Sequence, residues 1–159
     1  MAHYPTMKTE DICALPVKDL AADNCALIMW ATFPKLPEAL RVMDAWGFRY
    51  VTVAFNWFKT NKAGTPMFGI GYYTKSNSEI ALLGIKGKMK PASNFISQVI
   101  VSEREAHSKK PNIVREKIIG LFGDLPRVEL FSRKRVDGWD CFGNEVDSDI
   151  YLCNGAFRE

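Results

Sequence analysis

Apolar and polar positions alternate along the chain in blocks that predict strands separated by helices and loops. Five apolar runs have the length of a strand, and most are rich in β-branched or aromatic residues: residues 25–31, 50–58, 80–85, 98–101 and 127–131. The first run, from Cys25 to Ala31, is apolar without interruption, which is typical of a strand buried on both faces of a parallel sheet.

Amphipathic stretches between these runs predict helices. A short helix is expected from Thr9, stopped by Pro16, and longer helices are expected from Pro37 to Gly47 and from Pro111 to Gly123. Helices between strands imply right-handed βαβ crossovers, so we expect an α/β fold with a mostly parallel sheet. Ligands bind such sheets beyond the carboxyl ends of the strands, so candidate binding residues are sought just after each apolar run.

Length and composition favour one soluble domain. The 159 residues, of which 47% are hydrophobic, are enough for a single domain with a sizeable core over 1–159. The net charge of +3 is compatible with a nucleic-acid partner. No apolar stretch approaches the roughly 18 residues of a membrane span, and the first residues lack a signal core, so a cytoplasmic protein is expected.

Several chemistries are disfavoured by the residues themselves. The four cysteines are far apart, form no Cys-x-x-Cys pair and have only His3 and His107 to join them, so we expect reduced thiols and no metal site. The chain contains no Gly-x-Ser-x-Gly, Walker or His-Glu-x-x-His motif, which argues against hydrolases, nucleotidases and zinc proteases.

Three polar regions remain as binding candidates. The turn around Arg133 and the following Gly138–Glu145 suit a nucleoside with a charged tail, but for these residues alone a solvated basic turn is favoured, because basic loops are common. The Gly69–Tyr73 loop has lysines on both sides, which suits stacked bases and phosphates as well as a purely structural loop. Lys86, Lys88 and Lys90 could extend a phosphate-facing surface, but a solvated face is favoured. The residues alone therefore predict an α/β nucleotide-binding domain.

Short stretches also occur together in the order and spacing of a known family. They are His3–Met7, Trp30–Thr32, Leu36–Ala39, Ala45–Phe48, Gly69–Thr74, Ser78–Glu79, Lys110–Pro111, Glu129–Arg133, Gly138–Asp140 and Gly143–Glu145. Together they resemble the MT-A70 family over most of the chain, from Ala2 to about Asp149. The resemblance implies transfer of a methyl group from S-adenosylmethionine to the exocyclic amino group of adenine, on a circularly permuted Rossmann-like fold. This compact version resembles the bacterial and phage form, so DNA is the expected substrate and a bacterial or infected host cell the expected location.

Roles for individual residues follow from the same resemblance. Lys110 would pair with the carboxylate of the cofactor, Arg133 would lie beside its ribose or the same tail, and Asn144 would bind its adenosine end. Glu145 would contact ribose or adenine, although a glutamine is also seen at this position in the family. The substrate-binding residues implied are His3, Tyr4, Tyr72, Lys75 and Glu79.

One departure from the family divides the functional expectation. Relatives carry Asp-Pro-Pro-Trp on a strand shortly before the His-Tyr-Pro-Thr-Met stretch, whereas here Met1 precedes His3 by two residues and no Pro-Pro pair occurs. No catalytic residue is therefore assigned, and the sheet is expected to lack a central strand, so that a protein partner or self-association would cover the gap. Two hypotheses remain: a methyltransferase whose catalytic segment lies upstream, or a non-catalytic module that binds nucleic acid or supports an active partner. An unrelated α/β protein with an accidental resemblance is a third.

Overall fold

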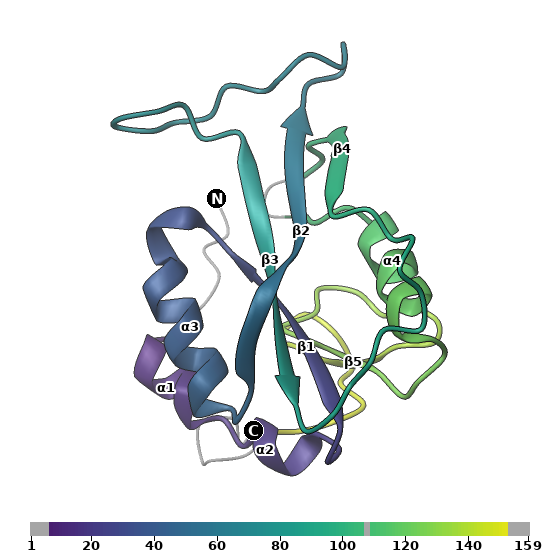
Figure 1. Ribbon diagram of the computed structural model, residues 1–159. Coiled ribbons are helices and arrows are strands. Elements are labelled where there is room, and N and C mark those ends of the chain that lie inside the picture. The colour runs from purple at the N-terminus through teal and green to yellow at the C-terminus, as the bar shows by residue number, and fades with distance from the viewer. Residues whose placement is uncertain (1–6, 107–108, 153–159) are drawn as a thin grey trace.

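The computed structural model describes residues 7–106 and 109–152, which form helices around a sheet (Figure 1). In chain order the elements are α1 (Thr9–Ala14), α2 (Val17–Leu20), β1 (Cys25–Ala31), the 3-10 helix η1 (Phe33–Lys35), α3 (Leu36–Ala45), β2 (Arg49–Thr60), β3 (Ser78–Lys86), β4 (Val99–Glu103), α4 (Ile113–Phe122), β5 (Val128–Leu130) and β6 (Asp140–Phe142). All five predicted strands and the predicted helices are present, so the α/β class is confirmed.

The main sheet is mixed, and the prediction of a mostly parallel sheet is wrong. Its strand order is β1-β3-β2-β4, in which β3 runs antiparallel to both of its neighbours and only β2 and β4 pair in parallel. The prediction assumed a helix between successive strands, but residues 61–77 contain none, so β2 returns to β3 through a loop. Because β1 and β2 both run antiparallel to β3, and β4 runs parallel to β2, these three strands point in one direction and their carboxyl ends lie at the same end of the sheet.

Strand β1 differs from its prediction in burial. It pairs with β3 alone among the described residues, and six of its seven residues are only partly buried. An uninterrupted apolar run indicates that a strand contains no polar residue. It does not indicate how many faces of the strand pack against other elements, or whether both of its edges pair with other strands. The helix predicted after it is present as α3, with Pro37 in its first turn and Gly47 at φ 87° just after its end.

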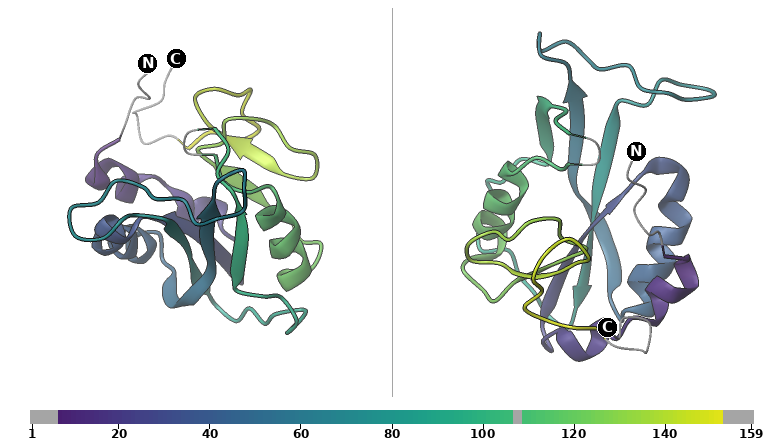
Figure 2. Two further views of the ribbon diagram at one scale, coloured as in Figure 1. Left: turned by 90° about the horizontal axis from the view of Figure 1, so that it is seen from above. Right: turned by 180° about the vertical axis from the view of Figure 1, so that it is seen from behind.

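Two apolar cores lie on opposite faces of the sheet. In β3, Ile80 and Leu82 pack in the cluster that contains Met43 of α3, whereas Ala81 between them packs with Val114 of α4. This alternation follows from the two-residue period of a strand, and it places α3 and α4 on opposite sides of the sheet (Figure 2). The strand ends that carry the polar residues described below are therefore fixed from both faces.

A second, two-stranded sheet follows α4. Strand β5 pairs in parallel with β6, and its Leu130 packs with Phe142 of β6 in the same cluster as Ala31 of β1. The sequence does not predict β6, because residues 138–145 have the composition of a glycine-bearing turn. Helix α1 begins at Thr9 as predicted, and no side chain caps its start, which follows Lys8. None of the helices within the described ranges has the length and apolarity needed to span a membrane.

Candidate functional site

Three charged residues, Lys59, Glu79 and Lys110, form a trio at the end of the sheet where β1, β2 and β4 terminate. The Nζ atom of Lys59 lies 2.8 Å from Oε1 of Glu79, and Nζ of Lys110 bonds to the other carboxylate oxygen of the same residue. Lys59 is near the end of β2, Glu79 is near the start of β3, and Lys110 follows β4. Three segments that are distant in sequence thus meet at one carboxylate.

Two tryptophans support the ammonium groups of this trio. Nζ of Lys59 lies 5.1 Å from the ring centre of Trp57, and Nζ of Lys110 lies 5.3 Å from that of Trp30. The two indole rings contact each other edge to face, with 6.1 Å between their centres. Cation–π contacts of this kind stabilise a desolvated ammonium group, so each lysine is held from two sides.

The carboxylate of Glu79 stays ionised although it is largely buried. Its side chain is 13% exposed, and burial by itself raises the pKa of the carboxyl group. Hydrogen bonds from Lys110 and Lys59, together with their charges, outweigh this effect and hold the pKa of Glu79 below its usual range. Because two ammonium groups share one carboxylate, the trio has a net charge of +1 and attracts anions.

A cavity of about 330 Å³ opens beside the trio. All three residues of the trio line it, and Arg104 adds a further cation to its wall. The lining also includes apolar side chains of the loop that leads from β2 to β3, such as Met67 and Phe68. A cavity lined by both cations and apolar groups suits a ligand with an anionic part and a flat apolar part.

The loop between β2 and β3 projects from this end of the sheet (Figure 1). Ile70, Tyr72 and Tyr73 in it are at least 94% exposed, and the two tyrosine rings contact each other. The loop is tight, because a Cβ atom at Gly71 would lie 1.8 Å from the carbonyl oxygen of Thr74. Tyr72 and Lys75 are exposed on the loop, whereas Glu79 lies in the trio, so the structure separates these implied substrate-binding residues into a surface group and a buried one.

The implied cofactor-binding residues also divide into two groups. Arg133 follows β5, and Asn144 and Glu145 follow β6, so these three exposed residues lie beyond the carboxyl ends of two parallel strands. The two loops touch, because a Cβ atom at Gly143 would lie 2.1 Å from the carbonyl oxygen of Ser132. Lys110 lies instead in the trio, where Glu79 already neutralises its charge in part.

Other sequence candidates lie elsewhere. Lys86, at the end of β3, pairs with Cys25 at the start of β1. Lys86, Lys88 and Lys90 therefore lie at the opposite end of the sheet from the trio. The interpretation of these lysines as a solvated face therefore fits the structure better than a phosphate-facing extension. His3, Tyr4 and His107 are outside the described residues. Across residues 7–106 and 109–152, no three His, Cys, Asp or Glu side chains gather as a metal site would require.

Sequence interpretation missed Lys59 and the two tryptophans as parts of the site. The sequence indicates Lys59 only as one of the lysines on either side of the Gly69–Tyr73 loop. The available signal was the spacing of Trp57 and Lys59, because residues two apart in a strand share a face.

Comparison with known proteins places the chain in a family. The sequence profile of the MT-A70 family matches residues 1–145, nearly the whole range that carries the motifs. The chain is 37% identical to the Type II methyltransferase M.MunI of Mycoplasma sp. over 145 residues, which is 90% of this chain and 60% of that protein. It is 26% identical to an Arabidopsis thaliana N(6)-adenosine-methyltransferase MT-A70-like protein over 159 residues, covering 98% of this chain and 23% of the relative.

A human relative matches in the same way. The catalytic subunit METTL3 of the human N(6)-adenosine-methyltransferase is 26% identical over 149 residues, which is 91% of this chain and 25% of METTL3. The chain thus spans from about a quarter to three fifths of the length of these relatives. The resemblance found in the motifs is confirmed by these matches, and the chain belongs to the MT-A70 family.

Proposed function

We propose that this chain forms the cofactor-binding and acceptor-facing part of an S-adenosylmethionine-dependent methyltransferase that modifies the exocyclic amino group of adenine in DNA. The observation that carries the proposal is the meeting of Lys59, Glu79 and Lys110 beside a cavity, in a chain of this family. The choice of DNA over RNA rests on the resemblance to the compact bacterial and phage form of the family, with which the 37% identity to a Mycoplasma methyltransferase agrees. The circular permutation of the fold, the gap left by a central strand and the single domain over 1–159 belong to the same proposal.

The side chains at the ends of β5 and β6 fit the chemistry of S-adenosylmethionine. This cofactor carries an amino-acid tail, a ribose and an adenine, and when bound it supplies an electrophilic methyl group. The guanidinium of Arg133 suits a carboxylate, and the amide of Asn144 can both donate to and accept from a nucleoside. The carboxylate of Glu145 suits ribose hydroxyl groups. Lys110 would bring an ammonium group to the tail while Glu79 keeps it in place.

The exposed loop and the cavity would receive the acceptor strand. Tyr72 offers a ring on which an unstacked base can lie, and Lys75 offers a cation for a phosphate. Glu79 then holds Lys59 and Lys110 at the cavity, where their net positive charge orients the anionic parts of the bound molecules. His3 and Tyr4 would close over the adenine, as the family resemblance implies.

The first test measures cofactor binding. Calorimetry with S-adenosylhomocysteine should show binding by the wild-type chain and about a tenfold weaker affinity for Asn144→Ala, because one hydrogen-bonded contact is lost. Asn61→Ala is the matched control, since the side chain of Asn61 bonds to Thr65 and Ala63 within its own turn, which follows β2 and not β6. Equal affinity of wild type and Asn144→Ala would remove Asn144 from the site, and no binding by the wild type would overturn the cofactor site.

The second test separates the two functional hypotheses. Radiolabelled methyl transfer to an adenine-containing DNA duplex should be compared with transfer to RNA of the same sequence. The 159 residues contain no Asp-Pro-Pro-Trp, an observation that favours a non-catalytic module for the chain by itself. Binding of nucleic acid without methyl transfer would support that alternative, whereas transfer to DNA would exclude it, and transfer only to RNA would overturn the choice of DNA.

A further inference from the structure

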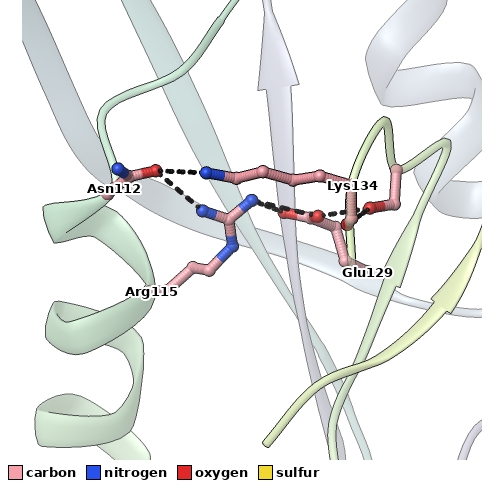
Figure 3. A network of polar contacts seen from close by, with 5 residues as sticks. Asn112, Arg115, Glu129 and Lys134 are labelled. Atoms are coloured by element: carbon pink, nitrogen blue, oxygen red, sulfur yellow. Dashed lines mark hydrogen bonds and ion pairs between the residues drawn. The ribbon is translucent and has the colours of Figure 1, made fainter. Parts of the chain in front are cut away.

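A polar network joins the start of α4 to the end of β5 (Figure 3). Nη2 of Arg115, in the first turn of α4, lies 2.8 and 3.1 Å from the two carboxylate oxygens of Glu129 in β5. The hydroxyl oxygen of buried Ser132 lies 2.8 Å from Oε2 of Glu129 and 2.6 Å from the carbonyl oxygen of Lys134. Its single proton can serve either acceptor, so Glu129 and the loop backbone share one donor.

The side chain of Asn112 belongs to this network and does not cap its own helix. An asparagine at the start of a helix commonly accepts a hydrogen bond from a backbone N–H of the first turn, but α4 has no such bond. Instead, Oδ1 of Asn112 accepts hydrogen bonds from Nη1 of Arg115 at 3.1 Å and from Nζ of Lys134 at 3.5 Å. Lys134 is thereby tied directly to the start of α4.

The loop held by these contacts has an unusual backbone. Phe131 has φ 57°, a left-handed conformation that is costly for a residue with a Cβ atom. Its ring packs edge to face against Phe142, with 6.0 Å between the ring centres. The N–H of Ser132 donates to the carbonyl oxygen of Phe142 at 2.9 Å. The reversal at Phe131 therefore occurs between fixed points, and it sets the direction in which Arg133 leaves β5.

We infer that Arg115 and Glu129 are positioning residues. They hold the loop that carries Arg133, residues 131–134, against the start of α4, so that Arg133 and Lys110 contact the same ligand. Each of these cations is close in sequence to a member of the network: Lys110 precedes Asn112 by two residues, and Arg133 lies between Ser132 and Lys134. The inference rests on the proposed cofactor site, but it assigns a role to residues that do not themselves contact the ligand.

The geometry of the Arg115–Glu129 pair suits this task. The two side chains are 19% and 31% exposed, so water screens them less than it screens a surface pair. The guanidinium of Arg115 contacts Glu129 through Nη2 and Asn112 through Nη1, and a lysine, which has a single nitrogen, cannot make both contacts in this geometry. Loss of the guanidinium should therefore loosen the loop even when the positive charge is retained.

The experiment compares Arg115→Ala and Arg115→Lys with Arg127→Lys as the matched control. Arg127 has the same side-chain exposure of 19% and also forms an ion pair, with Asp124, but it lies at the opposite end of β5. Two quantities are measured in each 159-residue protein: the hydrogen-exchange protection of the Ser132 amide, and the Kd for S-adenosylhomocysteine by calorimetry. We expect lower protection in both Arg115 variants and a Kd raised about tenfold in Arg115→Ala, with a smaller rise in Arg115→Lys. Arg127→Lys should leave both quantities as in wild type.

Each other outcome overturns a distinct part of the argument. Unchanged protection of Ser132 in Arg115→Ala would show that the network does not hold the loop. Reduced protection with an unchanged Kd would make the network purely structural. An equal rise in Kd for Arg127→Lys would show that any disturbance of β5 has this effect. Absence of binding by the wild type would instead overturn the proposed cofactor site itself, and the role of Arg115 and Glu129 with it.

Discussion

Glu79 shows how a single residue organises the candidate site. It is the only member of the trio that bonds to both of the others, and it lies where a strand from the middle of the sheet begins. The family resemblance assigned it to substrate binding, but in the structure its oxygens are occupied by Lys59 and Lys110. We therefore expect Glu79 to act mainly by holding the two ammonium groups at the cavity, and its part in substrate binding stays a prediction.

Replacement of Glu79 by glutamine should destabilise the protein at neutral pH. The change leaves two neighbouring ammonium groups without their shared counter-charge, and we expect the free energy of unfolding to fall by about 1–3 kcal/mol. The pKa of Glu79 is lower in the folded than in the unfolded protein, so its stabilisation is present above the unfolded pKa of about 4.3 and is lost as the pH falls through the folded pKa. The difference between wild type and Glu79→Gln should therefore shrink between pH 7 and pH 3 in urea unfolding.

A matched control distinguishes this effect from a general response to acid. Like Glu79, Glu10 forms an ion pair, in this case with Arg41, but the side chains of Glu10 and Arg41 are both more than half exposed. Glu10→Gln should change stability little at either pH, because exposed ion pairs are screened by water. A stability difference for Glu79→Gln that stays constant down to pH 3 would contradict the assigned role of its charge.

At the scale of elements, the helices and strands were predictable but their arrangement was not. The runs that became β1, β2 and β3 were recognised with boundaries within two residues, because apolar periodicity is a local property. The direction of β3 depends on the helix-free connection over residues 61–77, and β6 depends on pairing with β5. Neither is visible in a window of neighbouring residues.

Strand β1 leads to a prediction about self-association. Within the described residues it pairs along one edge only, with β3, and most of its apolar side chains are half-buried. Unpaired backbone groups beside apolar side chains favour pairing with another chain. We expect the isolated chain to associate as its concentration rises, which light scattering over a dilution series would measure. A monodisperse monomer over the whole series would contradict this prediction.

At the scale of the whole molecule, the two ends of the sheet differ in the groups that they carry. The trio, its cavity and the exposed loop lie at the end of the sheet where β1, β2 and β4 terminate. Lys86, Lys88 and Lys90 lie at the opposite end. With a net charge of only +3, the distribution of the cations matters more than their sum. The proposed acceptor strand should therefore contact only one end.

Salt dependence of DNA binding tests this asymmetry. If Lys75 contacts a phosphate, Lys75→Met should weaken binding and reduce the slope of log K against log salt by about 1, because one fewer counterion is released. Lys88→Met, an exposed lysine at the opposite end, should leave the slope unchanged. Equal effects of the two substitutions, measured by fluorescence anisotropy, would show that binding is not confined to the loop.

The sequence by itself determined the class of fold, the bounds of most elements and, through ordered motifs, the MT-A70 family, because periodicity and motif spacing are recorded in the linear order of residues. Only the tertiary structure decided that the sheet is mixed, that Glu79 bonds Lys59 and Lys110, and that Arg115 and Glu129 tie α4 to β5. These contacts join residues from 14 to 31 positions apart. Such contacts form because packing on both faces of the sheet brings the strand ends together, and no local pattern encodes that approach.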